Sequence, residues 1–253
     1  MQPVLLTAIG VGGATMVGAL LGFAIKKPSH RFNDILLSFA AGVMLAAAVI
    51  GLILPSLEYG AMPLSLITTV LGIFAGALCL NLIDKLVPHL HKLAGAEPEA
   101  HPEGYQRLNK VLLFVIAIAI HNLPEGIAAG VSFGGGDTSR AFSVAIGIAL
   151  QNIPEGMVII APMLAAGIKR GRTLMIALAT GIVEVLGTLM GYLAVSVSTA
   201  ILPFSLAFAG GTMLYVISDE MIPETHAHGS ERGATYALLV GFCLMLAFDL
   251  LLG

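Results

Sequence analysis

One polar phrase occurs twice in the chain, at positions thirty residues apart. Residues 118–126 read Ile-Ala-Ile-His-Asn-Leu-Pro-Glu-Gly, and residues 148–156 read Ile-Ala-Leu-Gln-Asn-Ile-Pro-Glu-Gly. Each copy lies in the middle of a long apolar run, where ionisable side chains are energetically costly and are usually functional. Imidazole, carboxylate and amide groups are also typical ligands for a metal ion. We therefore expect the repeated phrase to line a cation site inside a membrane.

The spacing within each copy puts three polar side chains on one face of a helix, because residues three or four apart are neighbours there. These side chains are His121, Asn122 and Glu125 in the first copy and Gln151, Asn152 and Glu155 in the second. A proline inside each copy removes a backbone hydrogen bond and frees a carbonyl oxygen one turn earlier. A kinked helix with a single polar residue is commonly structural, but two matching copies favour a cation site.

A third glutamate, Glu184, lies in the middle of another apolar run, with Gly181 and Gly187 about one turn to either side. Each buried glutamate costs roughly 2.5–3.5 kcal/mol to insert if it remains unpaired. No Lys or Arg lies in the middle of an apolar run to neutralise these groups, so a divalent cation or protonation must do so. The mixed nitrogen and oxygen ligands suit Zn²⁺ or Fe²⁺ better than Mg²⁺.

The elements that must position these groups are membrane-length helices. The chain has 253 residues, of which 57% are hydrophobic and 11% are charged. Its apolar segments run over residues 3–25, 33–57, 64–87, 108–133, 141–168, 174–197, 201–222 and 234–252. Each is close to or above the ~20 residues that a helix needs to cross the hydrocarbon. The sequence thus predicts an all-α polytopic membrane protein with a single transmembrane domain of eight helices, and a flexible loop over residues 88–107.

The distribution of basic residues predicts the orientation. If the eight segments cross alternately, eleven of the twelve Lys and Arg residues fall on one side and only Arg140 falls on the other. The positive-inside rule makes the first side cytoplasmic, so both termini are expected outside the cytoplasm and the loop 88–107 inside. The two copies of the phrase then lie on antiparallel neighbouring helices and should meet near the midplane of the bilayer.

His-Asn-x-Pro-Glu-Gly in the fourth apolar segment and the related Pro-Glu-Gly phrase in the fifth resemble the signature of the ZIP family of divalent-metal transporters, particularly its compact bacterial members. The resemblance covers essentially the whole chain. It implies movement of Zn²⁺, or of Fe²⁺, Mn²⁺, Co²⁺ or Cd²⁺, into the cytoplasm across a bacterial inner membrane. It also implies a site, often binuclear, between the fourth and fifth helices. An elevator-like motion of helices one, four, five and six against two, three, seven and eight is implied as well.

Matched position by position, the resemblance implies a set of metal ligands from four helices. They are His121, Asn122 and Glu125, then Gln151, Asn152 and Glu155, with Glu184 from the sixth helix and the thioether of Met44 from the second. Gln151 stands where many relatives have histidine, and the uncharged Asn152 where relatives can have aspartate. A single tight metal, a looser pair or an altered selectivity would each fit these differences. Simple gap-filling is the alternative role for Met44.

Acidic and histidine side chains also occur at the two expected mouths of a transport path. Glu58 and Asp249 lie toward the outside, where they could attract a cation. The cytoplasmic end of the seventh segment carries the residues Asp219, Glu220, Glu224, His226 and His228. A relay for metal release is one interpretation of this group, and an ordinary hydrated loop is the other.

Two other classes of function are compatible with buried glutamates. A proton-coupled carrier for an organic solute would need a basic or aromatic substrate contact at mid-depth, and none is found. An intramembrane metalloenzyme would normally carry His-Glu-x-x-His or several central histidines, whereas only His121 is central to an apolar segment. We therefore expect a transporter and not an enzyme, with the metal as substrate and no cofactor. The expected partners are metal ions and the bilayer, with a homodimer left open and no nucleic acid.

Overall fold

The computed structural model describes residues 1–25, 28–93 and 103–252, with side chains described outside positions 86–115 and 117. Within these ranges the regular structure is helical throughout and contains no β-strand. The elements are α1 (Gln2–Ala24), α2 (His30–Ala46), η1 (Ala47–Ile53), α3 (Leu54–Leu57), α4 (Leu64–Leu93), α5 (Glu103–Ser132), η2 (Phe133–Gly135), α6 (Thr138–Ala165), α7 (Arg170–Val197), η3 (Thr199–Ile201), α8 (Leu202–Val216), η4 (Ile217–Met221), α9 (Ile222–Thr225) and α10 (Glu231–Leu252).

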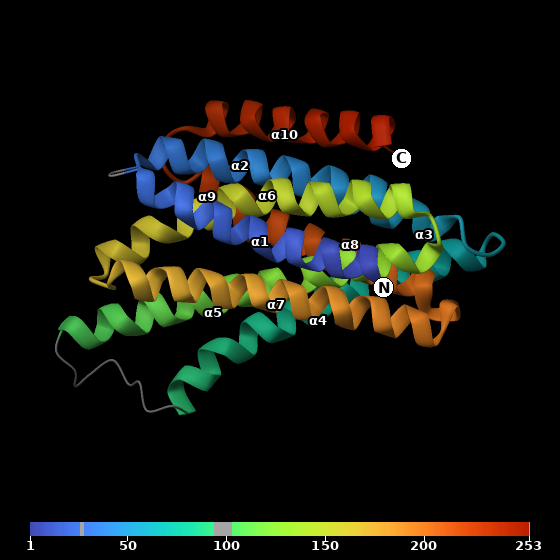
Figure 1. Ribbon diagram of the computed structural model, residues 1–253, viewed down its shortest axis with the longest axis horizontal. Coiled ribbons are helices and arrows are strands. Elements are labelled where there is room, and N and C mark those ends of the chain that lie inside the picture. The colour runs from blue at the N-terminus through green and yellow to red at the C-terminus, as the bar shows by residue number, and fades with distance from the viewer. Residues whose placement is uncertain (26–27, 94–102, 253) are drawn as a thin grey trace.

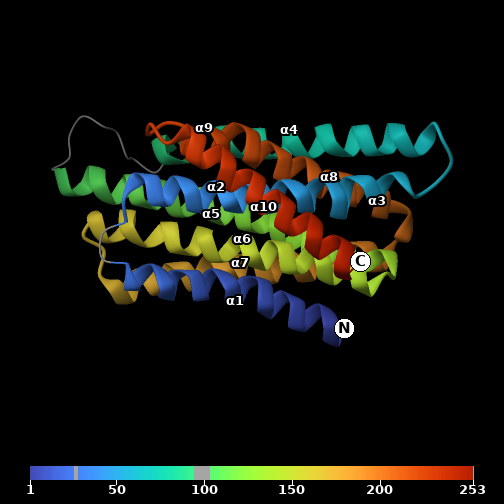
Figure 2. The same cartoon turned by 90° about the horizontal axis from the view of Figure 1, so that it is seen from above.

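The helices run roughly along one axis, and both ends of the chain lie at the same end of the bundle (Figures 1 and 2). Seven segments in the described part of the chain are long and apolar enough to cross a membrane. They correspond to seven of the eight predicted segments. The remaining predicted segment, residues 108–133, is covered by the 30-residue helix α5 except for its last residue, which begins η2. The predicted flexible loop is helical as far as Leu93 and again from Glu103, while residues 94–102 lie outside the described ones.

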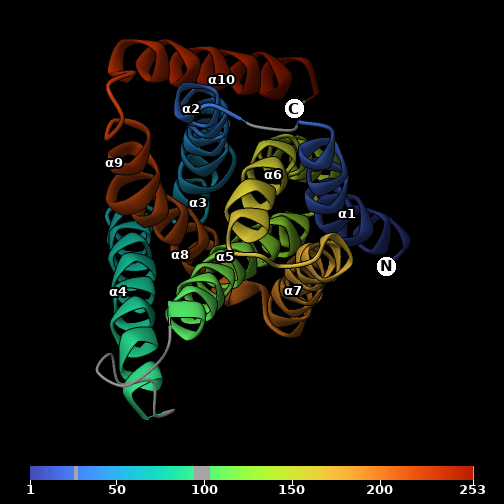
Figure 3. The ribbon, with the colours of Figure 1, turned by 90° about the vertical axis from the view of Figure 1, so that its left-hand side faces the viewer.

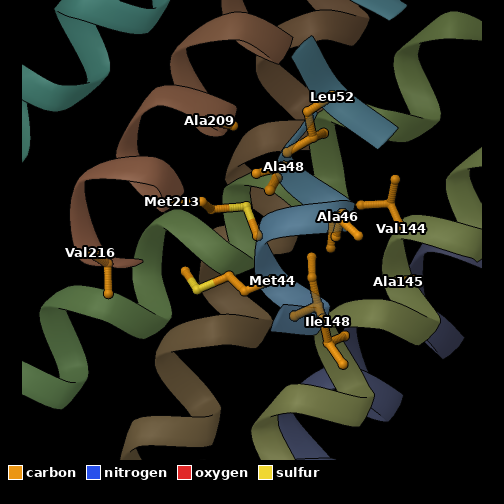
Figure 4. Packing of buried hydrophobic residues seen from close by; sticks show 14 of the residues in the cluster. Met44, Ala46, Ala48, Leu52, Val144, Ala145, Ile148, Ala209, Met213 and Val216 are labelled. Carbon is orange, nitrogen blue, oxygen red and sulfur yellow. The ribbon is translucent and has the colours of Figure 1, made fainter. Parts of the chain in front are cut away.

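The helices form two groups. In the end-on view of Figure 3, α1, α5, α6 and α7 gather on one side, and α2, α4, α8, α9 and α10 form an L-shaped frame around them. Contacts between α5 and α7 and between α1 and α6 dominate the first group, and α4 with α8 and α2 with α10 dominate the second. Helices α2 and α6 join the two groups through an apolar core. Figure 4 shows this core around Met44, Ile148 and Met213.

Glycine lets the helices of the first group approach until their backbones touch. A Cβ atom at Gly126 would lie 2.3 Å from the carbonyl oxygen of Glu184, and one at Gly156 would lie 2.2 Å from that of Thr15. Both distances are far below van der Waals contact, so only glycine fits. The glycine that ends each copy of the repeated phrase therefore fixes a helix–helix distance at the depth of the polar residues.

Two spanning segments of the frame contain a π-helical turn just before a proline. These turns are η1, which precedes Pro55, and η4, which precedes Pro223. A π turn adds one residue to the helical repeat and so rotates the side chains on either side of it. The turn η4 carries Asp219 and Glu220, and it sets the direction in which these two acidic residues point.

We expect a methyl group at Gly18 to destabilise the first group, because its Cβ would lie 2.1 Å from the carbonyl oxygen of Ile153 on α6. Overpacking of this kind typically costs about 1–3 kcal/mol. The matched control is Gly10→Ala, which adds the same methyl to the same helix at a position with no atom within 4 Å. Thermal unfolding of the purified protein in detergent should give a lower midpoint for Gly18→Ala than for Gly10→Ala. Equal midpoints would contradict the close packing.

Candidate metal site

The two copies of the repeated phrase meet inside the first group of helices. The amide nitrogen Nε2 of Gln151 on α6 donates to Oε1 of Glu125 on α5 at 2.8 Å. The next residue, Asn152, donates from Nδ2 to Oε1 of Glu184 on α7 at 2.7 Å. These four side chains are at most 1% exposed. Three helices thus bring two carboxylates and two amides into one buried polar cluster.

Helix α1 completes this cluster, which the sequence did not indicate. The hydroxyl of Thr15 donates to Oε2 of Glu184 at 3.1 Å, and Nδ2 of Asn152 also donates to the carbonyl oxygen of Val11 at 3.2 Å. Thr15 is 2% exposed. Its only sequence signal is a hydroxyl among the small residues of a helix-packing ridge, and that pattern is typical of ordinary packing as well.

Several oxygens of the cluster receive no hydrogen-bond donor from the described residues. They are Oε2 of Glu125, Oε1 of Gln151 and Oδ1 of Asn152. The carboxyl groups of Glu125 and Glu184 also approach each other. Two carboxylates in contact require a proton or a cation between them, and a buried acceptor without a donor is costly. The cluster therefore has the composition and the unpaired oxygens of a site that accepts a positive charge.

His121 lies on the edge of the cluster and faces the second group of helices. Its Nε2 is 2.8 Å from Oε1 of Glu220 on η4, and the two side chains are 18% and 34% exposed. The half-buried Glu155 interacts electrostatically with His121. Asp84 on α4 interacts with both His121 and Glu220. A chain of charged groups therefore runs from the buried carboxylates toward the end of the bundle where α4 and α5 are joined.

The structure does not assemble all predicted ligands around one point. No three His, Cys, Asp or Glu side chains in the described ranges are placed to hold one metal ion. The predicted ligands are instead hydrogen-bonded to one another or to neighbours. Gln151 bonds to Glu125, and Asn152 and Thr15 bond to Glu184. Glu220 bonds to His121. The buried Asn122 forms part of the same helix face.

Met44 lies in the apolar core. Its side chain is 1% exposed and packs among Ile148, Val216 and Met213, as Figure 4 shows. Ile148 lies one turn before Gln151 and Asn152, so Met44 approaches the polar cluster from the apolar side. The contacts of Met44 are those of a packing residue. Ligation by its thioether stays a prediction.

At the end of the bundle that holds the chain termini, the two predicted acidic residues have partners. Glu58 accepts a hydrogen bond from Nη1 of Arg140 at 2.8 Å, and Asp249 accepts one from the hydroxyl of Ser143 at 3.1 Å. Arg140 also interacts electrostatically with Asp249 and Asp137. The single basic residue predicted on this side therefore lies among the acidic ones, a pairing that sequence spacing does not reveal.

At the opposite end, the five residues predicted to form a relay at the end of the seventh segment have different partners. Glu220 reaches inward to His121, whereas His228 lies 3.0 Å from the buried carboxylate of Asp34 and stacks on the ring of His30. The remaining members of the predicted relay do not contact these two in any recorded interaction of the described residues. They are Asp219 and Glu224, both exposed, and His226, which bonds to the carbonyl oxygen of Ile222 at 2.8 Å.

Known proteins resemble this chain over nearly its whole length. Residues 91–249 match the family model described as ZIP zinc transporter. The chain is 41% identical to the zinc transporter GufA of Myxococcus xanthus over 256 residues, which covers 98% of each chain. It is 41% identical to the zinc transporter ZIPB of Bordetella bronchiseptica, with 95% of this chain and 78% of that protein covered. It is 31% identical to the human zinc transporter ZIP11, with 95% and 94% covered.

These proteins are transporters and not enzymes, and the long apolar helices of this chain agree with a multi-pass membrane location. The repeated Pro-Glu-Gly phrase and the helical bundle that buries it are accounted for together by one conclusion. The chain belongs to the ZIP family of zinc transporters, which are integral membrane proteins.

Proposed function

We propose that this protein imports divalent metal ions, Zn²⁺ first among them, into the cytoplasm across a bacterial plasma membrane. The observation that carries the proposal is the pair of buried hydrogen bonds Gln151–Glu125 and Asn152–Glu184. These bonds gather carboxylates and amides from α5, α6 and α7 around oxygens that have no other donor in the described residues. The relatives in bacteria and in animals are named as zinc transporters.

The proposed ligands come from both copies of the phrase and from two further helices. They are His121, Asn122, Glu125, Gln151, Asn152, Glu155 and Glu184, with Met44 as a thioether ligand from α2. In this proposal the bound metal ion supplies positive charge beside carboxyl groups whose hydrogen-bond donors are neutral. One imidazole and several hard oxygens make a site that Fe²⁺, Mn²⁺, Co²⁺ and Cd²⁺ could also enter, so selectivity rests on cavity size and ligand spacing.

The release path begins at His121. Glu220 holds one nitrogen of this imidazole, so a metal ion that leaves the cluster can pass from His121 to Glu220 without losing all negative neighbours. Asp84 and Asp219 extend the same electrostatic field. The excess of basic residues at this side of the chain supports its assignment as cytoplasmic, with both termini outside. At the outer mouth, Glu58 and Asp249 are the proposed attractors for an incoming cation.

The helix grouping supports an elevator-like movement. The polar ligands and Thr15 all belong to α1, α5, α6 and α7, which are held together by backbone contacts at glycine. Met44 on α2 and Glu220 on η4, which follows α8, belong to the frame. A rigid shift of the first group would carry the cluster past Glu220 and would break the Arg140–Glu58 pair, which also joins the two groups.

Replacing one glutamate from each copy of the repeated phrase tests the site. Glu125→Gln and Glu155→Gln each keep the size of the side chain and remove a charge, so ⁶⁵Zn uptake into proteoliposomes should fall to that of protein-free vesicles. Glu231→Gln, at the exposed start of α10, is the matched control and should transport like the parent. Parent-like uptake by both site variants would sink the ligand assignment, and competition with other divalent ions in the same assay would rank the metals.

Thr15 offers a sharper test, because it touches Glu184 but is not a proposed ligand. Thr15→Val removes only the hydroxyl and should weaken zinc binding, since the loss of a group that orients a ligand typically costs about 10–100-fold in metal affinity. Thr7→Val is the control. The hydroxyl of Thr7 is buried without a partner in the described residues, so its removal should leave zinc affinity unchanged. Thr15→Ser should restore binding. Isothermal titration with Zn²⁺ distinguishes the variants, and equal affinity for Thr15→Val and parent would exclude this role.

Uptake should weaken as the external solution is acidified. His121 and the carboxylates bind metal only in their deprotonated forms, so protons compete with the metal. Initial rates of ⁶⁵Zn uptake at constant free Zn²⁺ and clamped membrane potential measure this competition. A rate that rises steadily below about pH 5, near the ordinary pKa of glutamate, would contradict carboxylate ligation.

A further inference from the structure

A cleft of about 350 Å³ lies between α4, α5 and α8, away from the metal cluster. Its walls include Cys79 and Ile83 on α4, Ala119 and Leu123 on α5, and Phe208 on α8. In Figure 3, α4 forms the outer edge of the frame and diverges from α5. The volume is at the lower end of the range of ~300–1,000 Å³ that is typical of ligand pockets.

The lining of the cleft offers almost nothing to a polar occupant. Apart from the thiol of Cys79, its one polar side chain is that of Thr212, whose hydroxyl donates to the carbonyl oxygen of Ala209 at 2.7 Å. Pro124, which also lines the cleft, has no backbone N–H to donate. Water fills a cavity only where it finds several polar partners, and a metal ion needs ligands. The occupant must therefore be apolar.

The position of the cleft identifies the apolar molecule that can reach it. Phe208 lies near the middle of the spanning segment Thr199–Thr225, so the cleft is at the depth of acyl chains. The face of α4 beside it is apolar and open, with Phe74 and Leu78 exposed by 70% and 58%. Acyl chains that cover this face can enter the cleft without crossing a polar barrier.

The cleft lies against the face of α5 that is opposite the proposed metal ligands. The residues of α5 that line it are spaced three or four apart and form one helix face, namely Ile116, Ala119, Ile120, Leu123, Pro124 and Ile127. The ligand residues His121 and Glu125 lie on the other face. Whatever fills the cleft therefore packs between the first group of helices and the frame, directly behind the part of α5 that contains Pro124.

We propose that an acyl chain of a membrane phospholipid occupies this cleft and supports α5 from the side opposite the metal ligands. The acyl chain fills the space between α5 and the helices α4 and α8 and remains mobile there. The two groups of helices can therefore move past each other without separating interdigitated side chains. The claim of occupancy depends on the cleft alone, and the claim about movement rests on the proposed transport function.

The absence of tryptophan from the sequence makes a direct test available. Phe208→Trp places a single fluorophore in the cleft by an aromatic exchange. The protein is reconstituted in phospholipid that carries bromine in the middle of its acyl chains, because bromine quenches tryptophan on contact. Phe74→Trp, on the open face of α4, gives the signal of full lipid contact. The same Phe208→Trp reporter combined with Ala119→Phe, which fills the cleft with a side chain, gives the signal of a cleft closed to lipid.

Acyl occupancy predicts that brominated lipid quenches Phe208→Trp nearly as strongly as Phe74→Trp, and that Ala119→Phe reduces this quenching several-fold. Weak quenching of Phe208→Trp beside strong quenching of Phe74→Trp would overturn the proposal. If aqueous acrylamide, and not brominated lipid, quenches the fluorescence of Phe208→Trp, the cleft holds water and the proposal is overturned as well. Quenching by brominated lipid that appears only on dilution of the protein in the bilayer would show that a second copy of the chain covers the cleft.

The movement claim has a separate readout. Ala119→Phe should slow ⁶⁵Zn uptake several-fold while zinc affinity by titration stays that of the parent, because the ligands lie on the opposite face of α5. Ala179→Phe adds the same ring at an exposed position of α7 and should transport normally. If Ala119→Phe transports like Ala179→Phe, the acyl chain is a passive filler, and the claim about movement fails. If the parent itself does not transport zinc, the transport function fails instead and the quenching result still decides occupancy.

Discussion

The constraint on which the structure depends is the burial of two carboxylates, those of Glu125 and Glu184, inside a bundle that otherwise faces lipid. An unpaired buried carboxylate is unfavourable there, and no Lys or Arg among the described residues is buried beside these two. The neighbouring helices supply uncharged hydrogen-bond donors on short side chains. Gln151, Asn152 and Thr15 each donate one hydrogen bond to a carboxyl oxygen and bring no positive charge of their own. A cluster held in this way is rigid in position but still attractive to a cation.

The two groups of helices contribute different parts of this arrangement. The carboxyl and amide side chains of the cluster all come from α5, α6 and α7, and α1 donates to or accepts from them. The side chain that contacts the edge of the cluster comes from the frame, where Glu220 contacts His121. In the proposed elevator-like movement, a contact of this kind is a point at which the environment of the metal would change. The apolar core around Met44 and Met213 would be the surface along which the groups shift, since dispersion contacts between unbranched side chains adapt to small shifts.

Much of the fold could be predicted from sequence because membrane helices are specified locally. Hydropathy located the spanning segments, and the spacing of Asn152, Glu155 and their counterparts on α5 placed them on common faces. The partners across helices could not be predicted in this way. The bond from Thr15 to Glu184 joins residues 169 positions apart, and the pairing of Glu58 with Arg140 depends on how α3 meets α6. Glu220 was expected at a mouth, but the π turn η4 aims it at His121, and such a turn has no reliable sequence signal.

The close contacts at glycine have a consequence for the chemistry of the site as well as for packing. Gly126 rests on the backbone of Glu184, Gly156 rests on the backbone of Thr15, and Thr15 bonds to Glu184. These contacts join α5 to α7, α7 to α1 and α1 to α6, and the hydrogen bond from Gln151 to Glu125 closes the ring between α6 and α5. The oxygens inside this ring of four helices have little freedom to widen or narrow the space between them. For the proposed metal site, discrimination among ions of similar charge but different radius would therefore reside in the spacing of the helices, while the ligand atoms themselves remain the same.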